Sequence, residues 1–269
     1  MKVIPNCRFF VHNDSPCLTM LEGATELLDS HQIELMTMAA PIILFAYLVR
    51  GICGFGSGLI AIPVLSLMLP LTVAVPLVVM LDYLASAGHG VSLRLSIQWG
   101  EISRLIIPAL IGVSTGLLIF HNVDADLLPR ILGGFVFLYA LYSLWGPDIP
   151  RASSWWAVPA AFSGGAIGTL FGTGGPFYVS YLKARKLDKT AFRATFACIF
   201  LLDGAARVTG YLGTEVIDIQ LLVLLATSLP VMILGMYLGG KIHTGLSAEI
   251  FTRGISILLL ASGATLLLR

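Results

Sequence analysis

Charged side chains are scarce in this chain. Asp, Glu, Lys and Arg make up 12% of the 269 residues, whereas soluble domains carry about 25%. Hydrophobic residues make up 57%, and the mean hydropathy is +0.91. A soluble protein of this length needs a polar surface that this composition does not supply. We therefore expect an integral membrane protein that crosses the lipid bilayer several times.

Three further absences narrow the function. The net charge is only +1, so no long-range field attracts nucleic acid. The four cysteines (Cys7, Cys17, Cys53 and Cys198) have no zinc or haem spacing, and we expect no metal and no cofactor. No P-loop is present, which argues against direct driving by ATP.

The first 30 residues contain no apolar core of signal-peptide type, so we expect the first membrane helix to direct insertion.

Long apolar tracts follow one another from about residue 33 onward. A membrane span needs about 20 residues, and two of the tracts are too short to cross alone. Each short tract follows a glycine cluster, so we expect it to form a broken pair of half-helices with the tract before it. The tracts lie at 33–52, 57–69, 72–97, 101–120, 127–145, 155–170, 174–184, 189–211, 217–240 and 249–268.

One short motif occurs twice. Phe55-Gly56-Ser57-Gly58 recurs as Phe171-Gly172-Thr173-Gly174, and each copy lies between the two members of a broken pair. The next long tract carries a Leu-Asp dipeptide in both cases, at Asp82 and at Asp203. Glycine-broken hydrophobic segments at matching positions of two halves indicate the binding site of a transporter.

The motif divides the chain into two repeats. We expect an all-α membrane protein with a polar tail at 1–32, one repeat at 33–146, a linker at 147–153 and a second repeat at 154–269. Each repeat has about five helical elements and opens with a broken pair, which gives about eight to ten membrane helices.

Basic residues predict the orientation. The segment 183–193 holds five of the sixteen Lys and Arg residues, so we place it in the cytoplasm. An odd number of elements in each half makes the second half start from the opposite face. This predicts an inverted repeat, which permits alternating access. A single bent span at either glycine motif would change the parity.

The two glycine clusters are the first candidate binding elements. Glycines expose backbone N–H groups, and the positive end of a half-helix attracts an anion. The alternative is close helix packing through small residues. The candidate substrate-binding residues in and beside the clusters are Gly54, Gly56, Ser57, Gly58, Thr169, Gly172, Thr173, Gly174, Gly175 and Tyr178.

Arg50 directly precedes the first cluster, after about 17 apolar residues. An arginine at the centre of a membrane helix costs about 2.5–3.5 kcal/mol and usually faces a cavity or a partner. Its forked donors match the oxygens of an oxyanion, so we assign Arg50 to substrate binding. The alternative is that its side chain extends to a lipid headgroup.

Four residues are candidates for coupling. Asp82 and Asp203 match between the repeats, and a buried carboxyl group can carry a proton. A sodium site and a structural tie to arginine are the alternatives. His89 lies two helical turns after Asp82 and titrates near neutrality, or it is a hydrogen-bonding core residue. Arg207 lies one turn after Asp203 and either couples or pairs internally with that carboxylate.

The residues around both clusters resemble the TauE/SafE family of sulfite and organosulfonate exporters. The resemblance is carried by GICGFGSGLIAIPVL from Gly51, by SGGAIGTLFGTGGPFYV from Ser163, and by KTAFRAT from Lys189. It extends from about residue 33 to the end. Where the family often has three successive glycines, this chain has Gly56-Ser57-Gly58 and Thr173-Gly174-Gly175. The resemblance implies an exporter of a small anion, such as sulfite or an organosulfonate, in the bacterial inner membrane. The matched carboxylates Asp82 and Asp203 lead us to expect that transport is proton-coupled.

Other functions stay open at this point. A channel or a cation-coupled carrier would use the carboxylates of Asp82 and Asp203. An intramembrane serine hydrolase would use Ser57 as nucleophile and His89 as base, but the second copy has Thr173 at that place and no histidine of its own. We therefore expect no enzyme. The sequence leaves the oligomeric state, monomer or homodimer, undecided.

Overall fold

The computed structural model describes residues 30–90, 94–123, 127–145, 153–213, 216–241 and 248–268. Within these ranges the chain forms ten α-helices, two 3₁₀ turns and no strand, which confirms the all-α prediction. The expected tail lies almost wholly outside the described residues, and so does the expected linker. The helices are α2 (Ser30–Cys53), α3 (Ser57–Leu65), α4 (Leu71–Gly90), α5 (Trp99–Asn122), α6 (Leu127–Trp145), α7 (Ala157–Phe171), α8 (Gly175–Ala184), α9 (Lys189–Gly213), α10 (Ile219–Lys241) and α11 (Ala248–Leu268).

The helices follow the apolar tracts closely, with two differences. In the tract expected at 57–69, α3 ends at Leu65 and the last four residues form a turn. The tract expected at 72–97 is too long, because α4 already ends at Gly90 and residues Arg94–Ser96 form a 3₁₀ turn. Two glycines in the last three residues of α4 lower its helix propensity, and glycine favours a helix end.

Several helices have the length and composition of membrane spans. Trp99–Asn122, Leu127–Trp145 and Ile219–Lys241 are long and apolar enough to cross a bilayer. Shorter apolar stretches lie at Thr37–Ile52 and Leu71–Ala87, and at Ile255–Leu268. Large apolar side chains are exposed along the outside of the bundle, as lipid contact requires; examples are Ile107, Leu118, Leu138, Ile233 and Tyr237.

Both predicted breaks are present, and glycine makes them. Between α2 and α3, Gly54 and Gly56 have φ values of 86° and 101°, and between α7 and α8 Gly172 has a φ of 61°. These left-handed conformations are costly for residues with a Cβ atom. They turn the chain sharply, so that α3 and α8 begin inside the bundle.

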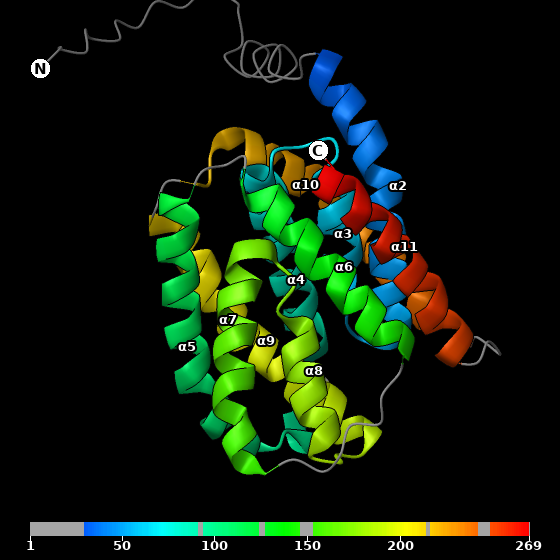
Figure 1. Ribbon diagram of the computed structural model, residues 1–269. Helices are drawn as coiled ribbons and strands as arrows, with labels where there is room; N and C mark the ends of the chain where they lie inside the picture. The colour runs from blue at the N-terminus through cyan, green and yellow to red at the C-terminus, as the bar shows by residue number, and fades with distance from the viewer. Residues whose placement is uncertain are drawn as a thin grey trace, which may run out of the picture.

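The two halves exchange their first helices. In the first half, α2 packs most extensively along α10 of the second half, and α7 of the second half packs most extensively along α5 of the first. The helices α4 and α9 pack together, as do α6 and α11. In Figure 1, α2 and α11 lie at one side of the bundle, while α5 and α7 lie at the other. This reciprocal packing is what a twofold relation between the halves produces. That the halves are inverted with respect to the membrane stays a prediction.

Small residues make these helix contacts close. A Cβ atom at Gly235 of α10 would lie 2.8 Å from the carbonyl oxygen of Leu44, and one at Gly116 of α5 would lie 2.8 Å from that of Ala166. In lipid, apolar burial does not by itself drive helices together, so close backbone packing carries much of the association.

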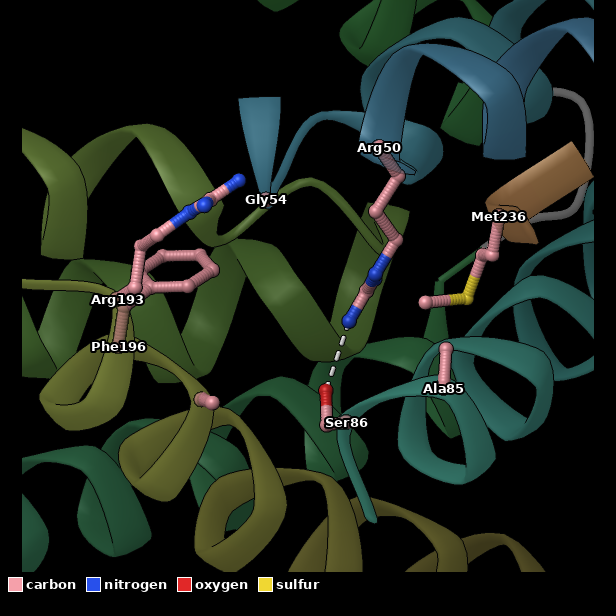
Figure 2. Close-up of a pocket in the computed structure, with 8 residues that line it drawn as sticks. Arg50, Gly54, Ala85, Ser86, Arg193, Phe196 and Met236 are labelled. Carbon is pink, nitrogen blue, oxygen red and sulfur yellow. Dashed lines mark hydrogen bonds between the residues drawn. The ribbon is translucent and has the colours of Figure 1, made fainter. Parts of the chain in front are cut away.

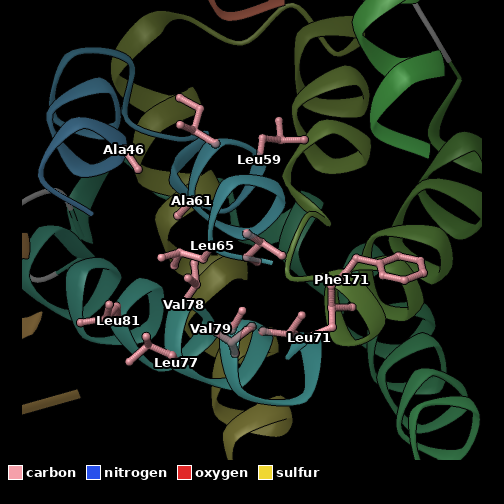
Figure 3. Packing of buried hydrophobic residues seen from close by; sticks show 14 of the residues in the cluster. Ala46, Leu59, Ala61, Leu65, Leu71, Leu77, Val78, Val79, Leu81 and Phe171 are labelled. Atoms are coloured by element: carbon pink, nitrogen blue, oxygen red, sulfur yellow. The ribbon is translucent and has the colours of Figure 1, made fainter. Parts of the chain in front are cut away.

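The short helix α3 lies in the centre of the larger apolar cluster. It is apolar on nearly every face, and eight of its nine residues are buried, as expected for a helix surrounded by protein. Figure 3 shows its side chain Leu65 near Val78 of α4, and Phe171 of α7 belongs to the same cluster of buried side chains. The core therefore supports the start of α3, where the site lies.

Candidate functional site

The two glycine motifs meet at the centre of the bundle. Gly58 of α3 lies directly against the carbonyl oxygen of Gly172, so that a Cβ atom at Gly58 would overlap this oxygen. The helices α3 and α8 both begin here, and their N-cap residues, Gly56 and Gly174, have no side chain to cap them. The first N–H groups of a helix have no partner within the helix, and they attract negative charge. Two such ends therefore converge on one point.

A small cavity of about 10 Å³ lies between the motifs. The first half contributes Asp82 and the residues around Gly56, and the second half contributes Thr173 and Phe200. A volume of roughly 10–15 Å³ is what one water molecule needs. An oxyanion does not fit in this conformation, so the centre is closed.

In the first half, an ion pair joins α2 to α4. Arg50 Nη1 lies 2.7 Å from Asp82 Oδ1, and the same oxygen accepts hydrogen bonds from Tyr47 (2.6 Å) and Ser57 (2.7 Å). Arg50 also donates to the hydroxyl of Ser57 (2.9 Å) and to that of Ser86 (2.7 Å). With 5% of its surface exposed, Arg50 is buried inside the protein and does not extend to a headgroup. The partners of this pair are all internal.

In the second half, a buried ion pair lies within α9. Arg207 pairs with Asp203 four residues earlier, as one of the two sequence-based interpretations expects. The Asp203 Oδ2 atom also accepts a hydrogen bond from Tyr178 at 3.2 Å, and Arg207 donates to the Gly164 carbonyl oxygen at 3.3 Å.

The second ion pair, unlike the first, contains buried side-chain atoms that have no hydrogen-bond partner. Within the described residues, three buried side-chain atoms have no hydrogen-bond partner: Thr173 Oγ1, Asp203 Oδ1 and Arg207 Nε. All three belong to residues at the second glycine motif, whereas Ser57, the counterpart of Thr173, makes two hydrogen bonds. Each unpaired buried group costs about 1–3 kcal/mol. The second half therefore has unused donor and acceptor capacity, of which the Thr173 hydroxyl belongs to a residue that lines the central cavity, whereas Asp203 and Arg207 do not line it.

The arginines come from different elements in the two halves. Arg50 precedes the first glycine break, whereas Arg207 follows Asp203 on α9. In the first half the position four residues after Asp82 is Ser86, which bonds to Arg50. Because the matched carboxylates recruit their arginines from different helices, the repeat in the sequence did not reveal this arrangement.

Phe200 of α9 lies between the two arginines. The centroid of its ring is 6.0 Å from Cζ of Arg50 and 5.9 Å from Cζ of Arg207, within the range of a cation–π contact. Sequence reasoning missed Phe200, and also Tyr47 and Ser86. The available signal was helical spacing: Phe200 lies three residues before Asp203, Tyr47 three residues before Arg50, and Ser86 four residues after Asp82.

The other sequence-based candidates have three different outcomes. Gly54, Gly174 and Gly175 lie in the two breaks next to the site. Thr169 does not contribute its side chain, because its hydroxyl donates to the Gly165 carbonyl oxygen inside α7 at 2.8 Å. The side chain of His89 lies outside the part of the chain that is described.

A separate ionic cluster ties α5 to α8. The carboxylate of Glu101 accepts hydrogen bonds from Tyr181 (2.5 Å), Arg185 (2.9 Å) and Arg104 (3.1 Å). The hydrogen bond to Glu101 raises the pKa of Arg185, which follows the end of α8. Tyr181 therefore serves this connection and does not reach the central cavity.

The architecture defines the class of protein. Two broken helices, whose half-helix ends meet at a buried charged centre of a helical membrane bundle, are typical of secondary transporters. The family model described as "Sulfite exporter TauE/SafE" matches residues 39–266. The chain therefore belongs to the TauE/SafE sulfite exporter family, as the resemblance implied. It is a multi-pass membrane transporter with a small-molecule substrate and not an enzyme, which removes the serine hydrolase alternative.

One relative supports this assignment. The chain is 26% identical over 198 residues to a protein of Comamonas testosteroni described as "Probable inner membrane transporter protein TsaS". The match covers 71% of this chain and 81% of the relative. No solved structure matches the chain.

Proposed function

We propose that this protein is a secondary transporter that exports a small anion, sulfite or an organosulfonate, across the bacterial inner membrane. The observation that carries the proposal is the convergence of two uncapped half-helix N-termini, those of α3 and α8, on one buried cavity. The family description and the printed description of the relative support the substrate class and the membrane.

The charges around the cavity favour an anion. Asp82 and Asp203 each have an arginine partner, so neither carboxylate cancels the positive ends of the half-helices. The same arginines disfavour a sodium ion at either carboxylate by charge repulsion. The sodium-coupled alternative is therefore the weaker one.

The closed centre favours a carrier over a channel. Since the cavity between the motifs has a volume of about 10 Å³, an oxyanion enters only after the halves move relative to one another. The reciprocal packing of the halves is compatible with an inverted repeat, in which such movement opens the site first to one face and then to the other.

Asp203 is the best candidate for a proton carrier. Its Oδ1 atom has no partner, whereas the Oδ1 atom of Asp82 is occupied by three donors. A proton bound at Asp203 would release Arg207 from its ion pair, and Arg207 would then be available to the anion.

The proposal is tested by sulfite flux into liposomes that contain the purified protein. We expect saturable flux that rises with an imposed pH gradient. In Thr173→Val we expect the flux to fall roughly tenfold, because the loss of one hydrogen bond to the anion costs about 1.4 kcal/mol. The matched control is Thr209→Val, which removes an exposed hydroxyl from α9. Flux that increases linearly without saturation would indicate a channel, and absence of flux for every small anion tried would refute the proposal.

A further inference from the structure

A second, larger cavity lies beside the central one. Its volume is about 60 Å³, and Arg50, Ser86, Arg193 and Phe196 line it. Figure 2 shows Arg50 extending from α2 to the hydroxyl of Ser86, with Gly54 next to the side chain of Arg193. At roughly 15 Å³ for each water-sized particle, this cavity has room for about four, which is the number of heavy atoms in sulfite. In this conformation it is therefore large enough for such an ion.

The lining of this cavity has one positive charge without a carboxylate partner among the described residues, that of Arg193, because Arg50 is paired with Asp82. Two arginines contribute to it, and no carboxylate side chain of the described residues does. Arg193 is exposed and donates to the carbonyl oxygen of Ile52 at 3.3 Å. Its Nε atom lies 3.4 Å from the position that a Cβ atom at Gly54 would take. The glycine break thus leaves space for the guanidinium group at the mouth of the cavity.

The larger cavity is connected to the central site through Arg50 and through a pair of stacked rings, Phe196 and Phe200. Arg50 lines the larger cavity and also bonds to Ser57 and Asp82 at the centre. The rings of Phe196 and Phe200 stack with their centroids 4.5 Å apart. Phe196 lines the larger cavity and Phe200 lines the central one. The two rings therefore form the partition between the cavities.

We propose that the larger cavity is a second anion site, in which Arg50 and Arg193 bind a small oxyanion before it passes to the central site. This inference rests on the proposed function and adds an access site on the face of the basic segment 183–193. Arg193 captures the ion, Arg50 contacts it in both cavities, and displacement of the Phe196 and Phe200 rings opens the path between them. The same guanidinium chemistry fits a lipid phosphate headgroup, which the experiment must distinguish from a free oxyanion.

The first test is the concentration dependence of sulfite transport from the basic face of the protein. In Arg193→Gln we expect the half-saturating concentration to rise about tenfold, as for the loss of one charged hydrogen bond, with a maximal rate within about twofold of wild type. The matched control is Lys183→Gln, which removes an exposed charge from the same segment but lies outside the cavity. An equal shift in both variants would mean that the positive charges only attract the anion in general, and it would overturn the proposal. Unchanged half-saturating concentrations in both variants would also overturn it.

The second test is calorimetric binding of sulfite to the protein in a phosphate-free detergent. Thr173→Val should keep this binding while transport falls, because Thr173 belongs to the central cavity. Loss of binding in Thr173→Val, or no weakening in Arg193→Gln, would contradict a separate site. Competition by added phosphatidylglycerol would show that a lipid headgroup is the occupant and would overturn the proposal. If wild type shows the binding but no flux, the proposed function fails and the binding site stands.

Discussion

Gly58 of α3 packs directly against the main-chain carbonyl oxygen of Gly172. These residues belong to the two copies of one motif in different halves of the chain, and no side chain separates them. The contact lies at the wall of the central cavity, next to Asp82. Any movement of one half relative to the other must change this contact, so it is sensitive to added volume.

Gly58→Ala tests this contact. The new methyl group would overlap the Gly172 oxygen, and overpacking of this kind costs about 1–3 kcal/mol. We expect a lower unfolding temperature in detergent and slower transport. Gly100→Ala is the control, because nothing lies within 4 Å of its added Cβ atom. Equal stability of the two variants would show that the motifs are not in tight contact.

The Arg50–Asp82 pair should be important for stability. Removing one partner leaves an uncompensated buried charge, so Arg50→Ala should destabilise the protein by about 3–5 kcal/mol. The double variant Arg50→Ala/Asp82→Ala should lose clearly less than the sum of the two single variants. Arg104→Ala breaks a more exposed pair with Glu101 and should cost at most about 1 kcal/mol. Strict additivity in the double-mutant cycle would contradict this pairing.

Ser57 and Thr173 should behave differently although they occupy matching positions. Ser57→Ala removes a hydroxyl that bonds to both Arg50 and Asp82, and should lower the free energy of unfolding by about 1–3 kcal/mol. Thr173→Val removes a buried hydroxyl that has no partner, and such a group costs about 1–3 kcal/mol, so the variant should be at least as stable as wild type while its transport rate falls. Thermal unfolding and flux measured on the same preparations separate these effects. A large loss of stability in Thr173→Val would show that its hydroxyl has a structural partner.

Asp203→Asn should flatten the pH dependence of anion transport, because a carboxamide neither binds nor releases a proton at the pH values at which transport is measured. Asp82→Asn should reduce stability and rate but keep the shape of the pH profile, since Asp82 acts in a network of internal donors. Initial rates in liposomes over a series of pH values give both profiles. A wild-type profile in Asp203→Asn would exclude that residue from coupling.

Much of the fold could be predicted because lipid imposes simple rules on sequence. Apolar tracts of about 20 residues must be helices, and the tract limits agree with the helices except at the ends of α3 and α4. Gly54, Gly56 and Gly172 predicted the breaks, since left-handed backbone conformations favour glycine. The matched carboxylates Asp82 and Asp203 were found because they recur at equal places in the two halves.

The pairing of these carboxylates could not be predicted. Arg50 reaches Asp82 from another helix, whereas Arg207 reaches Asp203 within α9, and the sequence contains no common pattern for the two. Phe200 resembles any apolar residue of a membrane helix until the structure places its ring near Arg50 of α2 and Arg207 of α9. Likewise, the cavity between Arg50 and Arg193 exists only where α2, α4 and α9 meet.

By itself, the sequence determined that this is a helical membrane protein with two related halves and two glycine-broken helices, because hydrophobicity and backbone freedom are local properties of the chain. Only the tertiary structure decided that Gly58 touches Gly172, that three donors meet one oxygen of Asp82, and that Thr173, Asp203 and Arg207 retain unpaired atoms. These relationships depend on distances between helices, and no local pattern of residues encodes them.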